Sequence, residues 1–176
     1  MKGVIINTFE NFLNDTFGVE TWDNVLDEAK CEDVFVGTKT YDDKVFFKLF
    51  MTSIEMKGLV ADEALKLFGR YALPVLMKYG GDLVSHYENS IDVLLELDSI
   101  IHVEVKKLMD EARPPKFIIE KIDDKKLHIH YISDRNLPSF VEGLLEGLAY
   151  YYNEKVDIKS QKQEDGTYIF NADYSE

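Results

Sequence analysis

Cysteine is almost absent from this sequence, since Cys31 is the only one in 176 residues. A single cysteine excludes an intramolecular disulfide, a cysteine-based zinc site and an iron–sulfur cluster. No apolar run approaches the roughly 20 residues that a membrane helix needs. The opening Met-Lys-Gly-Val-Ile-Ile-Asn is too briefly apolar for a signal peptide. We therefore expect a cytoplasmic protein that neither spans nor binds a membrane.

Positive charge is also scarce, because 20 Lys and Arg residues stand against 33 Asp and Glu, giving a net charge of −13. Such a chain repels phosphate backbones, so nucleic acid is a poor partner. Apolar residues, in contrast, make up 45% of the chain and aromatic residues 12%. This is enough for a sizeable core and for a cavity that holds a flat, apolar cofactor. The length predicts one domain, residues 1–176.

The hydrophobic period changes about two thirds of the way along the chain. Helical spacing dominates first, and it predicts helices over 3–17, from Thr21 through Leu26, over 41–56, 60–79 and 91–113. Pro74 should kink or interrupt the fourth of these. Strand-like alternation follows at 117–119, 127–131, 155–159 and 167–172, around one helix at 138–152. The sequence thus predicts an α+β fold: a helical N-terminal part, then a four-stranded antiparallel sheet with one helix.

A histidine lies in the apolar stripe of the 91–113 helix. The stripe includes Leu94, Leu95, Ile101, Val105, Leu108 and Met109, and His102 shares a face with Leu95 and Val105. Two interpretations stay open at this point. The imidazole could be a core histidine that hydrogen-bonds a backbone carbonyl, or an axial ligand to a metal or haem.

One face of the 127–131 strand combines apolar and polar side chains. Alternation puts Leu127, Ile129, Tyr131, Ser133 and Arg135 together. The last three offer hydrogen-bond donors along about 13 Å of strand. Two carboxylates on one edge of an apolar ligand, such as the haem propionates, would match them. Arg135 could equally be a solvated residue at the strand end.

These motifs resemble those of H-NOX domains, the haem nitric oxide/oxygen-binding family. Tyr131-Ile132-Ser133-Asp134-Arg135 is similar to the family's Tyr-x-Ser-x-Arg motif, and the residues around His102 resemble its proximal haem-ligand region. The Met-Lys-Gly start, Pro115 and Glu-Gly-Leu-Leu-Glu-Gly at 142–147 also resemble this family. The resemblance covers the whole chain and divides it into a helical subdomain of about 1–60 and a haem-bearing subdomain of about 61–176.

The resemblance implies a role for each matching residue. His102 would bind the iron of haem b, while Tyr131, Ser133 and Arg135 would hold the propionates. Pro115 would press on the macrocycle and help to distort it. Side chains from three helices would line the pocket, namely Ile5, Phe9, Ala72, Leu76, Phe140 and Leu144.

Phe140 stands where oxygen-binding members of the family carry a distal tyrosine. Phenylalanine has no hydroxyl to stabilise bound oxygen. The resemblance therefore implies a sensor of nitric oxide, which also binds CO, at a five-coordinate ferrous haem. Nitric oxide would weaken the bond from iron to His102 and shift the helical part against the sheet part.

The expected protein is a stand-alone sensor and not an enzyme. At 176 residues we expect no fused output domain, so the signal would pass to a histidine kinase or a cyclic-di-GMP enzyme. Three alternatives remain: an oxygen or general gas sensor, a haem-free interaction domain that binds another apolar carboxylate, and an enzyme with a histidine metal site.

Five further residues receive simpler interpretations. His128 and His130 should lie on the opposite face from Tyr131, as surface histidines. Asp98, one turn before His102, could be a partner of that histidine, but we expect an exposed helix carboxylate. Asp42 or Asp43 could pair with Arg135.

Overall fold

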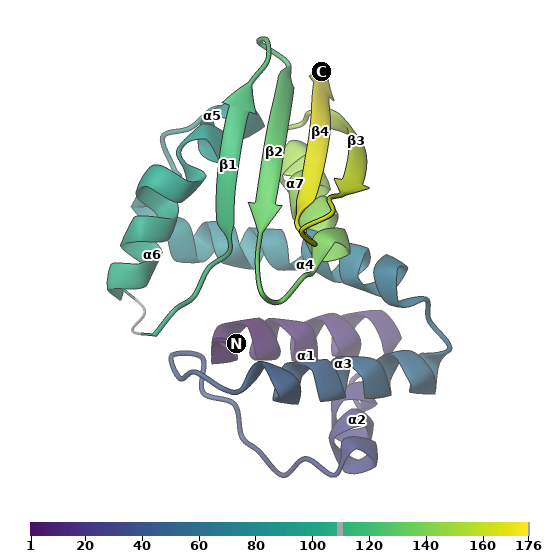
Figure 1. The fold of residues 1–176 in the computed structure, drawn as a ribbon. Coiled ribbons are helices and arrows are strands. Elements are labelled where there is room, and N and C mark those ends of the chain that lie inside the picture. Colours follow the sequence, from purple (N-terminus) through teal and green to yellow (C-terminus); the bar gives the residue numbers. More distant parts are fainter. Residues whose placement is uncertain (109–110, 176) are drawn as a thin grey trace.

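The N-terminal part of the computed structural model holds four helices (Figure 1). These are α1 (Gly3–Phe17), α2 (Thr21–Ala29), α3 (Asp43–Lys57) and α4 (Ala61–Gly80). The structure describes residues 1–108 and 111–175. Each of these helices is predicted by the sequence, and α2 begins at Thr21 without a side-chain cap. The amide of Trp22 donates instead to the side-chain oxygen of Asn14 in α1, 3.0 Å away. The neighbouring helix thus supplies a hydrogen-bond acceptor for one of the free amides at the start of α2.

The predicted 91–113 helix is not continuous. It consists of α5 (Ser90–Leu95), a π-helical turn η2 (Leu97–Ile101) and α6 (His102–Leu108), after a short 3-10 turn η1 (Gly81–Leu83). The wider turn shifts the following residues around the helix axis. Before the turn, Leu95 is 37% exposed while Leu94 is buried, so the predicted face is only partly correct. Met109, assigned to the same stripe, lies outside the described residues.

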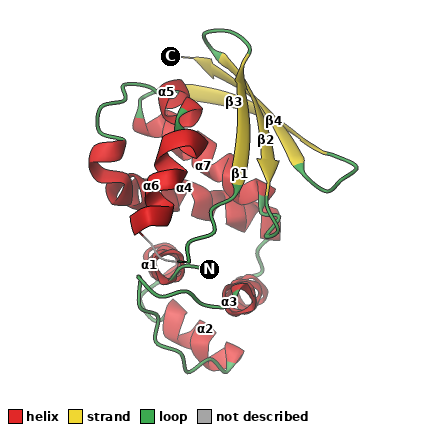
Figure 2. Ribbon diagram, turned by 60° about the vertical axis from the view of Figure 1, so that its left-hand side comes forward, coloured by secondary structure: helices red, strands yellow, loops and turns green. Residues whose placement is uncertain are grey.

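The four strands form one antiparallel sheet, as the sequence predicts, and the structure gives their order as β1-β2-β4-β3. They are β1 (Lys116–Lys121), β2 (Lys126–Ile132), β3 (Lys155–Lys162) and β4 (Tyr168–Ser175). Figure 2 shows the helices gathered on one side of this sheet. Helix α7 (Pro138–Tyr151) covers that side, where Tyr131 is buried. His128 and His130 lie on the other face, as expected, and contact Asn171 and Thr167 of the neighbouring chain segment.

The interior consists of two hydrophobic cores with α4 between them. Ala72 and Phe68 of α4 belong to the core of α1–α3, while Leu73 belongs to the core under the sheet. Pro74 lies inside α4, which continues to Gly80, so the proline does not interrupt the helix.

Two glycines allow α4 and α7 to approach each other closely. A Cβ atom added to Gly143 would lie 2.1 Å from the carbonyl oxygen of Lys66, and one added to Gly69 would lie 2.3 Å from that of Phe140. The helices therefore pack backbone to backbone at this crossing. Within the described part of the chain, no helix combines the length and the apolar character needed to cross a membrane.

Candidate functional site

A cavity of about 330 Å³ lies between the two cores. Its walls are mostly apolar and come from both halves of the chain. Phe46 and Phe68 line it from the N-terminal core, and Leu73, Phe117 and Leu145 line it from the core under the sheet. A large apolar chamber with a few polar groups is the usual form of a ligand-binding site.

The histidine of the predicted stripe lines this cavity from the start of α6. The Nδ1 atom of His102 lies 3.2 Å from Oδ1 of Asp98. Burial lowers the pKa of His102, and the neighbouring Asp98 opposes this effect without cancelling it. The lowered pKa favours the neutral form of the ring, which is the form that binds metals. Asp98 is therefore a partner of His102, and the expectation of a carboxylate without this contact is wrong.

The polar motif lines the same cavity as the histidine. Tyr131 is the penultimate residue of β2, and Ser133 and Arg135 follow just after the strand ends. The Tyr131 hydroxyl accepts a hydrogen bond from the amide of Leu137 at 3.2 Å, which fixes the phenol in place. The strand alternation that suggested one shared face holds only as far as Tyr131. The turn after β2 nevertheless places Ser133 and Arg135 at the cavity wall.

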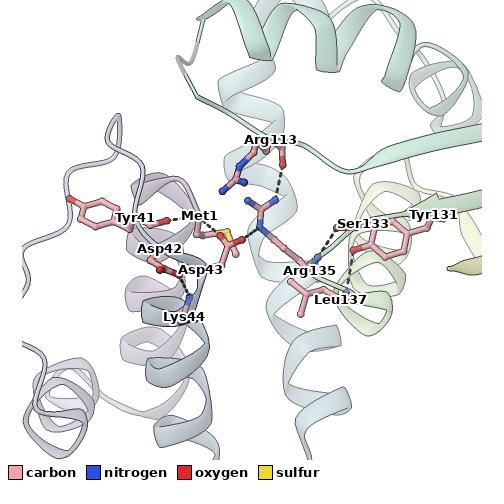
Figure 3. Close-up of polar contacts among 10 residues, drawn as sticks. All are labelled: Met1, Tyr41, Asp42, Asp43, Lys44, Arg113, Tyr131, Ser133, Arg135 and Leu137. Carbon is pink, nitrogen blue, oxygen red and sulfur yellow. Dashed lines mark hydrogen bonds and ion pairs between the residues drawn. The ribbon is translucent and has the colours of Figure 1, made fainter. Parts of the chain in front are cut away.

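The guanidinium of Arg135 joins three parts of the chain (Figure 3). Its Nε atom donates to Oδ2 of Asp43 at 2.9 Å, and Nη1 donates to the carbonyl oxygen of Arg113 at 2.6 Å. The terminal amino group of Met1 also donates to Asp43. Burial raises the pKa of Asp43, but these two cations outweigh it and lower the pKa below its usual value. Of the two expected partners, Asp43 is the one that pairs, while Asp42 caps α3 through the amide of Lys44.

The remaining predicted residues divide into two groups. Ile5, Leu76, Pro115, Phe140 and Leu144 line the cavity. Contrary to expectation, Phe9 and Ala72 do not. Both are fully buried in the N-terminal core, where the Phe9 ring packs at 5.0 Å from the Phe68 ring.

Sequence reasoning also missed several residues of the cavity wall. Phe117 lies opposite Tyr131 across β1 and β2, and their rings are 5.5 Å apart. Cross-strand pairing from Tyr131 could have identified it. Leu148, one turn after Leu144 on α7, could have been found from helical spacing.

Comparisons with known proteins agree with this geometry. A sequence model of the haem-NO-binding family matches residues 2–160. The unliganded Fe(II) H-NOX protein from K. algicida is 26% identical, the match covers 100% of this chain and 97% of that chain, and the TM-score is 0.90. The S. oneidensis H-NOX protein in the Fe(II)NO state is 23% identical, with 100% of both chains covered and a TM-score of 0.92. A search of curated proteins gives no match.

The α+β fold, the apolar cavity and the neutral imidazole at its wall define a haem-binding domain of the gas-sensing class. The chain belongs to the haem-NO-binding, or H-NOX, family. Its cavity fits haem on its own chemistry, because it offers an imidazole, apolar walls, and two hydroxyls with a guanidinium at one edge. The residues that would hold the group are His102 and the Tyr131, Ser133 and Arg135 set.

Proposed function

We propose that this protein is a nitric oxide sensor whose haem b is ligated by His102 and anchored through its propionates by Tyr131, Ser133 and Arg135. The observation that carries the proposal is that all four side chains line one apolar cavity. When bound, the haem supplies an iron atom that takes up a diatomic gas. Pro115 and Ile5, which line the same cavity, would contact the macrocycle.

The choice of gas depends on Phe140. Its ring lies 5.1 Å from that of Phe68, and neither of these two side chains carries a hydrogen-bond donor. Bound oxygen carries partial negative charge and gains from a donor, whereas nitric oxide needs little polar help. We infer that the pocket favours nitric oxide and CO over oxygen.

Transmission of the signal would use the connections of Arg135. This residue follows β2, and its partner Asp43 begins α3, so the ion pair joins the sheet part to the N-terminal helices. A change at the haem that disturbs Arg135 would reach α3 through this contact. The recipient would be a separate cytoplasmic protein, for which a histidine kinase and a cyclic-di-GMP enzyme are the two candidates.

Substitution of Phe140 by tyrosine tests both the function and the selectivity. The wild-type ferrous protein should show a Soret band that shifts when nitric oxide or CO is added. In air it should form no stable oxygen complex. The Phe140→Tyr variant should gain roughly ten- to hundredfold in oxygen affinity, because a hydrogen bond to a charged acceptor contributes about 1.5–3 kcal/mol. Oxygen dissociation rates measured by stopped flow would give the affinity change.

Phe140→Leu is the matched control, since it alters the ring without adding a donor and should leave oxygen binding unchanged. Identical oxygen and nitric oxide kinetics in Phe140→Tyr and the wild type would mean that residue 140 does not face the ligand. A stable oxygen complex in the wild type would favour the oxygen sensor, and the absence of any Soret band would favour a haem-free domain.

Loss of Arg135 should weaken haem retention more than loss of Ser133. Arg135→Ala removes a charge-assisted partner of a propionate, which costs about 1.5–3 kcal/mol, so haem loss to a scavenger should accelerate roughly ten- to hundredfold. Ser133→Ala removes one neutral hydroxyl and should have a smaller effect. Asp43→Asn is the control that weakens the ion pair to α3 but keeps the guanidinium. Haem loss as fast in Asp43→Asn as in Arg135→Ala would assign the effect to helix pairing rather than to propionate binding.

A further inference from the structure

The π-helical turn directly before His102 changes the hydrogen bond at the start of α6. In a regular α-helix the amide of His102 would donate to the carbonyl of Asp98. Here it donates to the carbonyl of Leu97, five residues earlier, while the amides of Ile100 and Ile101 both donate to Glu96. Such turns are rare and frequently occur at functional positions.

The side chain of Asp98 is held between this turn and the sheet. Its Oδ1 atom lies 3.2 Å from Nδ1 of His102 and accepts a longer hydrogen bond, of 3.4 Å, from the amide of Phe117 in β1. The rings of Phe117 and His102 lie 5.9 Å apart. The carboxylate thus contacts two elements that both contribute side chains to the cavity wall.

The two side chains of this pair differ in their exposure. The His102 side chain is 14% exposed and lines the cavity, while the Asp98 side chain is 37% exposed and lies at its outer side. With Nδ1 bound to the carboxylate, Nε2 is the ring nitrogen that has no hydrogen-bond partner among the described residues. A carboxylate acceptor at one nitrogen fixes the proton there and leaves the lone pair at the other.

We propose that Asp98 is a positioning residue for the iron ligand. Its carboxylate accepts a hydrogen bond from Nδ1–H of His102 and makes the lone pair of Nε2 a stronger ligand for iron. The inference rests on the proposed function. Carboxylates in this arrangement raise the basicity of a ligating histidine and fix its ring orientation. The bond from His102 to iron therefore resists breaking when nitric oxide binds, and the wild-type protein keeps this bond for longer than a variant without the carboxylate.

The test compares Asp98→Ala and Asp98→Asn with the wild type in the haem-loaded ferrous state. The resonance Raman band of the iron–histidine stretch should move to lower frequency in Asp98→Ala. Release of His102 after mixing with nitric oxide, followed by absorbance, should become about tenfold faster or more, in line with the effect of losing such a partner. Asp98→Asn keeps an acceptor oxygen but loses the negative charge. The shift of its iron–histidine band should therefore be no larger than the shift in Asp98→Ala.

Glu104→Ala is the matched control, because its carboxylate is on the same helix but pairs with Lys107. An unchanged iron–histidine band in Asp98→Ala overturns the inference, and so does an equal shift in Glu104→Ala. If Asp98→Ala does not retain haem, the nearly isosteric Asp98→Asn decides in the same way. Lack of a Soret band in the wild type would instead refute the proposed function, so the two failures are distinguishable.

Discussion

Replacement of His102 by glycine should abolish the native ferrous haem spectrum. The imidazole is the only histidine side chain among the described residues of the cavity wall, so its removal leaves the iron without a proximal nitrogen ligand. Absorbance of the purified, reduced variant measures the loss. Added imidazole should restore much of the spectrum, because the vacated space is at the wall of an apolar cavity.

His130→Ala is the control for this experiment. His130 lies on the opposite face of the sheet, where its Nε2 atom is 2.7 Å from the hydroxyl of Thr167, and its loss should leave the spectrum intact. A native ferrous spectrum in His102→Gly without added imidazole would refute the assignment of the ligand.

Gly143→Ala should destabilise the fold by about 1–3 kcal/mol, which is the usual cost of overpacking. Its methyl group would lie 2.1 Å from the carbonyl oxygen of Lys66, so α4 and α7 must separate. The gain in helix propensity, about 1 kcal/mol, offsets only part of this cost. Thermal unfolding measures it, with about 2–4 °C lost for each kcal/mol in a chain of this size.

Gly147→Ala supplies the comparison on the same helix. Its methyl group would lie 3.1 Å from the Cβ atom of Leu73 and 3.3 Å from the Cα and carbonyl oxygen of Arg70, contacts that a small shift of the helix backbone relieves. The same gain in propensity then leaves a net change within about 1 kcal/mol of zero. Equal unfolding temperatures for the two variants would contradict the backbone contact between α4 and α7.

The regular elements were predictable because their periodicity is strong. The α3 helix has Asp42 as its cap and acidic residues at its start, and β2 alternates without exception from Leu127 to Tyr131. The π-helical turn was not predictable in the same way. It depends on how the residues after Glu96 fit against β1, and the apolar spacing of the sequence is compatible with a continuous helix.

In the candidate site, too, some residues follow from the sequence pattern and others do not. His102 and Tyr131 could be found because an apolar stripe and a strand face point them inward. The sequence offered Asp98 as a partner of His102 but could not favour it, because a carboxylate four residues from a histidine is also common on solvent-exposed helix faces. Phe9 was assigned to the cavity because helical spacing gives the direction of a side chain but not its depth. The ring faces inward, yet Phe46 and Phe68 lie between it and the cavity.

The position of Pro74 in α4 has a mechanical consequence. Phe68 and Ala72, before the proline, belong to the core of α1–α3, whereas Leu73 directly before it and Met77 after it pack in the core under the sheet. Proline has no amide hydrogen, so the carbonyl of Arg70 already lacks its helical partner at this point. Bending α4 here breaks no further backbone hydrogen bond, so the helix is most compliant where the two cores meet. The part of α4 after Pro74 can then tilt relative to the part before it, which the close contact of Gly69 with Gly143 holds against α7.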